Sequence, residues 1–228
     1  MSVFVMRRGE PPATFDAIFA NNSWETIIAV CQRGIAPNSW AVGDSKMMTI
    51  GDTGYQIDII GKNHDTYTAG GTAPLTFQMH DCYSTRIMNG SMNNIGGWAD
   101  CEMRKMHLPA ILALMPTEVQ NSIREVNKLT SAGNNSTTIN TTADKLFLLA
   151  EVEIFGSTSV SVSGEGTQYA YYKAGNSKIK NAGGSISRWW TRSPNKSSIY
   201  SFCYVDSTGN SNTKDADYDM GVAFAFCF

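Results

Sequence analysis

The chain has few charged residues and no long apolar run. Charged residues make up 17% of its 228 residues, below the roughly 25% of an average soluble chain. The formal net charge is −2, and no block of Lys and Arg is present that would follow a phosphate backbone, so no nucleic-acid partner is expected. No apolar run approaches the roughly 20 residues of a membrane-spanning helix, so no membrane insertion is expected.

Cysteine is scarce and unpatterned. The chain has five cysteines, and no two of them show the C-x-x-C spacing of a zinc or redox site. We therefore expect buried, reduced thiols that act as small apolar side chains. A disulfide between Cys203 and Cys227 stays open, because it needs their strands to be neighbours and the sequence does not show whether they are.

The three histidines show no arrangement typical of a site. None has the H-x-x-x-H or H-E-x-x-H spacing of a metal centre. His64 and His80 each precede an aspartate, but adjacent strand residues face opposite sides, so loop or surface histidines are expected. A catalytic carboxylate pair could be assembled from among Asp58, Glu151 and Glu153, but only by assuming a fold that brings two of them together. No nucleophile-elbow, Walker or dinucleotide motif occurs, so we predict no enzyme activity, no metal and no cofactor.

Residues 1–22 are predicted to be an attachment arm. Pro11-Pro12 and Asn21-Asn22 interrupt any regular element in this segment. The positive charge of the opening segment follows its apolar residues, the reverse of a secretory signal, so no signal peptide is expected. Residues 23–228 are predicted to form one domain, because no clear linker or internal repeat divides them.

A helix is predicted directly after the arm. Asn22 is its expected cap, Glu25 completes the capping box, and Gly34 ends it. Its apolar face consists of four side chains: Trp24, Ile27, Ile28 and Cys31. Residues 47–50 and 55–60 then flank a glycine-containing turn and predict a hairpin, whose second strand has one apolar face, made of Tyr55, Ile57 and Ile59.

A short strand at residues 75–79 and two helices are predicted next. One helix spans residues 103–115, and Thr117 caps the other, with Gln120 at the capping-box position. The apolar face of the first helix is Met106, Ala110, Ile111 and Leu114. A polar loop is predicted at 131–142. Residues 145–154 are strand, helix, or one after the other, because periodicity does not settle short apolar runs.

The C-terminal half begins where helix signals stop, at Gly156. Trp189 and Trp190 are adjacent, so on an extended chain they face opposite sides, and at least one is expected in the core. Arg192 is expected to pin a backbone turn through its planar donor fork. Residues 221–228 predict a last strand with one aromatic face: Val222, Phe224, Phe226 and Phe228. The predicted class is α+β, with two or three helices, short antiparallel sheets and an irregular, loop-rich C-terminal half.

Residues 195–219 form a polar stretch that is dominated by Asn, Ser, Thr, Asp and Tyr. Within it, residues 200–205 predict a strand and residues 207–210 a turn. Tyr offers rigid amphipathic area and small polar side chains offer adaptable hydrogen bonds, which is the composition of adaptable binding surfaces. A solvated loop that binds nothing is the alternative, and composition alone does not choose between them.

Three motifs near the C-terminus carry a resemblance to a known family. They are W-W-x-R-S-P from Trp189, F-C-x-V from Phe202, and G-V-A-F-x-F-C from Gly221. With upstream pieces they resemble a domain family of gut bacteria and their phages: Trp40–Asp44, Asn63–Asp65, Gly96–Trp98, Arg124–Thr130 and Lys145–Gly156. That family is similar to the variable proteins of diversity-generating retroelements, and the resemblance implies a C-type lectin-like fold.

The resemblance also implies residue roles. The expected ligand-contacting residues are Tyr200, Tyr204, Asp206, Asn210, Asn212, Asp215, Asp217 and Tyr218. The expected scaffold residues are Trp189, Trp190, Arg192, Cys203, Val205, Gly209, Gly221, Phe224 and Phe226. The calcium-binding E-P-N and Q-P-D signatures of sugar-binding lectins are absent, so no calcium is expected.

The function implied is that of a receptor-binding protein at a phage tail or fibre tip, with a potentially hypervariable surface. Its ligand would be a bacterial cell-surface protein or glycan. Other virion proteins would bind the arm, and a homo-oligomer such as a trimer is an open alternative. The expected location is the virion, or the cell surface if the gene is chromosomal. Two other functions stay open: a structural virion or assembly protein, and a copper oxidase like the formylglycine-generating enzymes, using Cys203 and Cys227.

Overall fold

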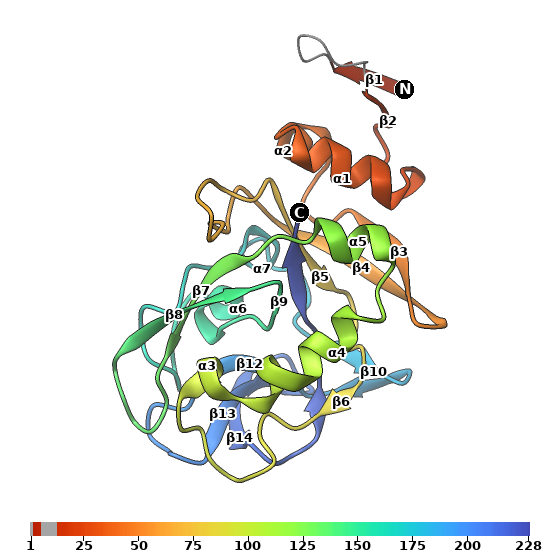
Figure 1. Cartoon of the computed structure of the whole chain (residues 1–228). Coiled ribbons are helices and arrows are strands. Elements are labelled where there is room, and N and C mark those ends of the chain that lie inside the picture. Colours follow the sequence, from red (N-terminus) through yellow and green to blue (C-terminus); the bar gives the residue numbers. More distant parts are fainter. Residues whose placement is uncertain (1, 6–12) are drawn as a thin grey trace.

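A computed structural model gives the structure of the chain and describes residues 2–5 and 13–228, with side chains from residue 14 onward. Figure 1 shows an elongated molecule with a two-stranded hairpin at one end and strands β12, β13 and β14 at the other. The described residues form seven α-helices and several small, mostly antiparallel sheets, so the α+β class is confirmed. Two or three helices were too few, because one-turn helices leave no periodic signal in a sequence. None of the described helices has both the length and the apolar character to cross a membrane.

The predicted arm is in part continuous with the body. Strands β1 (Ser2–Val5) and β2 (Ala13–Asp16) pair antiparallel, and a 3₁₀ turn (Phe19–Asn21) follows. Phe15 and Phe19 are buried, and their ring centroids lie 5.5 and 5.2 Å from that of Trp40. The arm therefore joins the core at its second half, while Pro11-Pro12 lies outside the described residues.

The first long helix matches its prediction except at its cap. Helix α1 (Trp24–Gln32) buries the four predicted apolar side chains, and Gly34 follows it in the left-handed region. Ser23 rather than Asn22 caps the helix, because the Ser23 hydroxyl accepts the Thr26 N–H. Asn22 instead donates to the carbonyls of residues 16, 18 and 19 and closes the preceding turn. A short helix, α2 (Ala36–Ser39), packs beside α1.

One five-stranded sheet, here called the upper sheet, carries the predicted hairpin. In spatial order its strands are β3 (Ser45–Ile50), β4 (Thr53–Lys62), β5 (Leu75–Met79), β16 (Ala225–Cys227) and β9 (Leu146–Phe147). The register Ile50↔Thr53 leaves a two-residue turn, as the glycine there permits. The predicted hairpin and the strand at 75–79 are both confirmed.

The C-terminal segment is buried on both of its faces. The predicted aromatic residues of this strand are buried, and so are the alternate positions Ala223, Ala225 and Cys227. The cause is its place inside the upper sheet, between β5 and β9. The prediction of a single buried face was therefore incomplete.

The middle helices differ from their prediction. The elements are α3 (Gly97–Asp100), a π-helical turn (Met103–His107), α4 (Leu108–Leu112) and α5 (Thr117–Ser122). The predicted apolar face was wrong, because Met106 is 61% and Leu114 51% exposed. The buried residues are Met103, Leu108, Ile111 and Met115. The π turn separates the first two by five positions, and this shifts the inward face away from regular helical spacing.

The predicted cap of α5 was also wrong. Pro116 stands at the cap position with no side-chain hydrogen bond to the helix, and Thr117 is already helical. The Gln120 amide donates instead to the carbonyls of Ala113 and Met115 and fixes the preceding turn.

A twisted antiparallel ribbon takes up the two ends of the polar loop predicted at 131–142, and residues 132–138 remain a loop. Strands β7 (Val126–Ser131) and β8 (Ile139–Asp144) form it and leave only a short connection. Residues 145–154 are strand and then helix, since β9 is followed by α6 (Glu151–Phe155). One more helix, α7 (Ala170–Lys173), lies in the half where no helix was predicted.

A second five-stranded sheet, here called the lower sheet, takes up the C-terminal half. In spatial order its strands are β14 (Ser211–Asp215), β13 (Ser201–Val205), β12 (Trp189–Pro194), β15 (Met220–Gly221) and β6 (Thr85–Arg86). A small hairpin, β10 (Lys180–Ala182) and β11 (Ser185–Ser187), precedes it. The predicted strand at 200–205 is confirmed, whereas β14 was not predicted.

Candidate functional site

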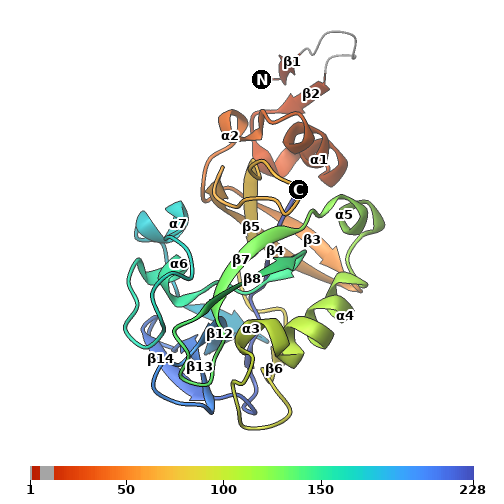
Figure 2. The ribbon, with the colours of Figure 1, turned by 60° about the vertical axis from the view of Figure 1, so that its left-hand side comes forward.

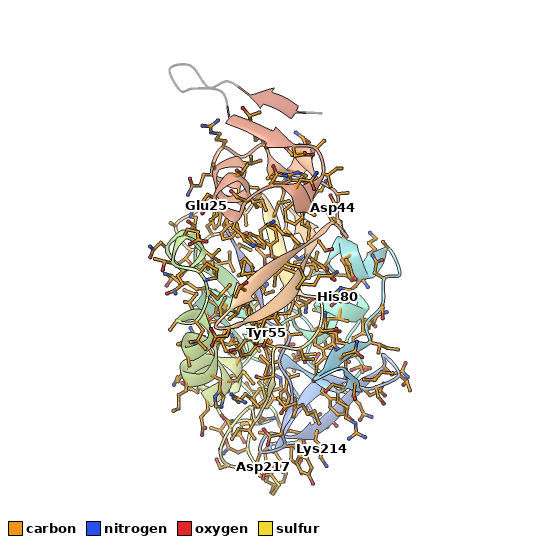
Figure 3. All side chains as sticks on the ribbon, turned by 90° about the vertical axis from the view of Figure 1, so that its right-hand side faces the viewer. Glu25, Asp44, Tyr55, His80, Lys214 and Asp217 are labelled. Atoms are coloured by element: carbon orange, nitrogen blue, oxygen red, sulfur yellow. The ribbon has the colours of Figure 1, made fainter. Side chains whose placement is uncertain are left out.

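The polar stretch gathers at the end of the molecule opposite the N-terminal hairpin. Strands β13 and β14 both lie within it and form one edge of the lower sheet. In Figure 3, the labelled Lys214 and Asp217 lie at the end opposite Glu25 and Asp44. This end of the molecule is called the lower end below.

Most of the predicted contact residues face solvent there. The exposed ones are Tyr200, Asn210, Asn212, Asp217 and Tyr218. Asp206 and Asp215 are half-buried, and Tyr204 is buried. The structure thus brings these residues to one end but does not expose them equally.

Tyr204 does not fit the role of a displayed side chain. It is 5% exposed, and its ring packs edge-on against Trp190, its partner across β12 and β13, with 6.3 Å between ring centroids. The Arg188 guanidinium lies 6.0 Å from the same ring. Strand alternation turns Tyr204 inward with Phe202, so it belongs to the frame under the surface.

Asp206 builds the turn at the tip of the β13–β14 hairpin. Its carboxylate accepts hydrogen bonds from the Thr208 N–H and hydroxyl and from the Asn210 N–H. The Thr208 side chain and the Asn210 backbone lower the pKa of Asp206. Gly209 adopts a φ of 84°, which a side chain would disfavour, and this agrees with its expected scaffold role.

A loop that sequence reasoning missed lies against the polar stretch. Residues 87–96 run between β6 and α3, and Figures 1 and 2 both show this loop at the lower end. Asn94 is fully buried, and its amide donates to the Ser198 and Ser201 carbonyls at 2.7 and 2.8 Å. A buried asparagine in an asparagine- and glycine-containing loop gives no periodic signal, so only the fold reveals its contacts.

A buried polar cluster lies under the lower sheet. The Arg192 side chain has no exposed surface and forms a two-pronged ion pair with Glu153, at 2.5 and 2.9 Å. The same guanidinium donates to the carbonyls of Leu129, Leu148 and Glu165. Arg192 was predicted to pin one backbone turn, but it holds three separate backbone segments, and its pairing with Glu153 was not foreseen.

Lys128 extends this cluster toward the upper sheet. Its ammonium donates to Asp65 at 2.7 Å and to Glu153 at 2.8 Å, and Tyr169 also contacts it. Burial alone would raise the pKa values of Asp65 and Glu153, but the neighbouring cations outweigh it and lower both, that of Asp65 to about 2. These carboxylates are therefore ionised partners of buried cations.

Glu165 is the exception within the cluster. It accepts hydrogen bonds from the Ser131 N–H and the Ser193 hydroxyl, and no cationic side chain among residues 14–228 forms an ion pair with it. Burial raises its pKa to about 7. A cavity of about 240 Å³ opens beside it and beside Glu153 and His64.

Glu151 connects the cluster to the β13–β14 hairpin. This carboxylate is fully buried and accepts the N–H groups of residues 159–161 and the hydroxyls of Ser159 and Ser211. Burial opposes its charge, but these hydrogen bonds outweigh burial and lower its pKa. Because Ser211 begins β14, helix α6 holds the outer strand through Glu151.

The two histidines that precede an aspartate lie in loops, as predicted, and each ring has a specific neighbour. His64 is stacked on Tyr169 with 3.9 Å between ring centroids, and burial lowers its pKa. His80 is about half-exposed, and its Nδ1 lies 2.7 Å from the Asp58 carboxylate, which raises its pKa. As predicted, neither histidine pairs with the aspartate next to it in sequence. Among residues 14–228, no three His, Cys, Asp or Glu side chains are placed to hold a metal.

The five cysteines are buried and free. Cys203 lies in the lower sheet and Cys227 in the upper sheet, where its Sγ lies 3.8 Å from Asp65. Burial raises both pKa values well above the usual range. The structure does not bring the two thiols together, so neither the open disulfide nor a paired copper site has geometric support.

The comparisons with known proteins identify the family. Residues 76–228, well over half of the chain, match the model of a domain of unknown function, DUF6273. The chain belongs to the DUF6273 family. No curated protein and no solved structure matches it significantly.

The DUF6273 region begins and ends in neighbouring strands. Its first residues lie in β5 and its last in β16, and the register pairs Thr76 with Cys227. The region contains the lower sheet, the loop at 87–96 and most of the buried polar cluster, whereas α1, β3 and β4 precede it. The family match therefore covers the whole candidate binding end.

The expected scaffold residues divide between the two sheets of this DUF6273 domain. Trp189, Trp190 and Arg192 lie in the lower sheet and are fully buried. Phe224 and Phe226 pack with the upper sheet, where Phe226 stacks on Phe77 at 5.3 Å between ring centroids. The aromatic C-terminal strand thus does not hold the binding end directly. The lower sheet and the polar cluster do.

Proposed function

We propose that this chain is a ligand-binding protein that recognises a bacterial surface molecule with its lower end. The observation that carries the proposal is the gathering of exposed polar and tyrosine side chains at one end, opposite the N-terminal hairpin. An attachment segment at one end and a recognition surface at the other suit a phage tail or fibre tip. The surface would be potentially hypervariable, as in the variable proteins that the sequence resembles.

A C-type lectin-like fold is part of the proposal. It is supported by the mixture of short helices with small antiparallel sheets and by the irregular C-terminal half that carries the polar stretch. The frame beneath the surface supports display as well. Burial of Trp190, Tyr204 and Arg192 stabilises the lower sheet without help from the exposed residues of β14.

The test is binding of the labelled chain to a panel of gut bacterial isolates, measured by flow cytometry. The variant to compare is Asn212→Ala, Asp217→Ala and Tyr218→Ala combined, since all three side chains are exposed. We expect binding to fall at least about tenfold, the effect of losing about 1.4 kcal/mol of contact energy. The denaturation midpoint should stay nearly unchanged, because exposed substitutions alter stability by roughly 0.5 kcal/mol or less each.

A matched control places exposed substitutions away from the lower end, Asn38→Ala in α2 with Asp52→Ala in the β3–β4 turn. The control should bind cells as the unaltered chain does. Binding that survives the triple substitution would contradict the site. Binding of the unaltered chain to none of the isolates would contradict the proposed function and favour a structural virion role.

A further inference from the structure

The lower end exposes an apolar and aromatic surface that spans two segments of the chain. In the loop at 87–96, Met92 is 49% and Ile95 59% exposed. In the polar stretch, Tyr200 is 47% and Tyr218 50% exposed. Exposed clusters of this kind mark interaction sites more often than scattered single residues do.

Backbone hydrogen bonds hold the two segments side by side. The Asn94 N–H donates to the Ile199 carbonyl at 2.8 Å, and the N–H of Met88 donates to the Ala216 carbonyl at 2.8 Å. Ala216 in turn donates to the Tyr200 carbonyl at 3.0 Å. Ala216 lies between the two tyrosines in the sequence and contacts the loop, so loop and tyrosines form one continuous face.

This face is preorganised. Asn94 lies at its centre with no exposed surface, and its side-chain oxygen also accepts the Asn134 N–H from the turn of the β7–β8 ribbon. Lys214 lies over the ring of Tyr218, with its ammonium 3.6 Å from the ring centroid, and orients that ring. Ordering these groups before binding lowers the entropy cost of association.

The polar part of the same face carries an excess of negative charge. Residues 195–219 contain four aspartates and two lysines. Asp217 and Asp219 are exposed, and neither has a hydrogen-bond or ion-pair partner among the side chains of residues 14–228. Acidic groups around an apolar centre complement a partner surface that carries Lys and Arg.

We infer that the ligand is a protein with a basic, partly apolar surface, and that the loop at 87–96 supplies part of its binding site. This inference rests on the proposed function and specifies its partner. Exposed Met and aromatic side chains are typical of the centre of protein interfaces. Sugars and small molecules bind in concave sites, and cavities of about 260, 220 and 240 Å³ lie elsewhere, beside α4, His80 and Glu165.

The experiment first separates the ligand classes. Isolates that bind the unaltered chain are treated either with a protease, to remove surface proteins, or with periodate, to oxidise surface glycans. We expect protease to reduce binding at least tenfold and periodate to leave it within about twofold. Binding should also weaken several-fold between 50 and 500 mM salt, because salt screens contacts between charges.

The second arm tests the loop. Met92→Ser with Ile95→Ser should weaken binding to the same cells at least tenfold. The matched control is Met47→Ser with Ile18→Ser, two side chains that are 58% and 62% exposed in the half of the molecule that carries α1. The control should bind unchanged, and both variants should keep the denaturation midpoint of the unaltered chain.

The outcomes are distinct from those of the proposed function. Binding lost after periodate, or kept after protease, would overturn the protein ligand and leave the binding function standing. Binding unaffected by the Met92 and Ile95 substitutions would overturn the role of the loop. A chain that binds no isolate at all contradicts the proposed function, and the inference falls with it.

Discussion

Arg192 and Glu153 form a two-pronged ion pair that is closed off from solvent, with N–O distances of 2.5 and 2.9 Å. Arg192 comes from the lower sheet and Glu153 from α6, which Glu151 links to β14. The pair is further tied to the upper sheet through Lys128 and Asp65. The two sheets of the domain are thus joined by charges as well as by apolar side chains.

Replacing Arg192 with Met should destabilise the protein by about 3–5 kcal/mol, because Glu153 then loses its strongest partner inside the protein. Arg192→Lys should also be destabilising, since one ammonium does not reproduce a planar fork. Urea denaturation midpoints measure both. Lys145→Met, at an exposed position, is the control and should change stability by less than about 0.5 kcal/mol. A loss below about 1 kcal/mol for Arg192→Met would show that the pair is not coupled to folding.

Glu165 should make stability depend on pH near neutrality. Its pKa is raised from 4.5 to about 7 in the folded protein, so the folded state holds a proton that the unfolded state releases. Stability should therefore fall as pH rises from about 4.5 to about 7 and level off above that, by about 3 kcal/mol in all. Denaturation midpoints measured across this pH range would show the slope.

Glu165→Gln is the matched control for this pH dependence, because it keeps the shape of the side chain without a titrating group. His80, whose pKa is raised by Asp58, changes stability in the same direction and stays present in both proteins. The difference between the two pH profiles therefore isolates Glu165. Parallel profiles would contradict the prediction.

The displayed surface and the core should respond very differently to truncation. Phe226→Ala should cost roughly 3–5 kcal/mol, because the ring is fully buried and stacks on Phe77. Asn212→Ala, at an exposed position of β14, should cost roughly 0.5 kcal/mol or less. Similar losses in the two variants would mean that the polar stretch supports the core.

Gly221 is required because of a close approach. A Cβ atom at this position would lie 2.3 Å from the Cys82 sulfur and 2.9 Å from the Arg188 carbonyl oxygen. Gly221→Ala should therefore destabilise the protein by roughly 1–3 kcal/mol. Adding Cys82→Ala removes the nearest atom and should restore part of that loss, which a double-mutant cycle of unfolding free energies would measure. An equal loss in both backgrounds would place the strain at Arg188 instead.

Local sequence patterns predict those parts of the fold that depend only on residues close together in the sequence. The α1 face, the β3–β4 hairpin and β5 follow from apolar spacing and glycine turns, and the structure has all three. The buried face of the segment from Met103 to α4 cannot be predicted from regular helical spacing. The π turn changes the spacing between the buried residues Met103 and Leu108. Strand β14 escapes prediction because Ser211–Asp215 contains no apolar residue and is paired on one side only.

The candidate site is only partly readable from sequence, for a related reason. The polar stretch is unusual in composition and can be found, but composition does not show that Tyr204 turns inward. The partners Asp65, Lys128, Glu153 and Arg192 are far apart in the chain, and charged residues are normally expected on the surface. Their meeting depends on the arrangement of the sheets, which no local pattern encodes.

The interior position of β16 couples folding to a complete reading frame. Thr76 pairs with Cys227, 151 residues later, so the upper sheet lacks an inner strand until the ribosome has made residues 225–227. A frameshift or premature stop anywhere in residues 195–219 removes that strand and the buried Phe226 with it. Substitutions at the exposed positions leave it intact. A changed surface is therefore compatible with a complete upper sheet, whereas a frameshift within residues 195–219 is not.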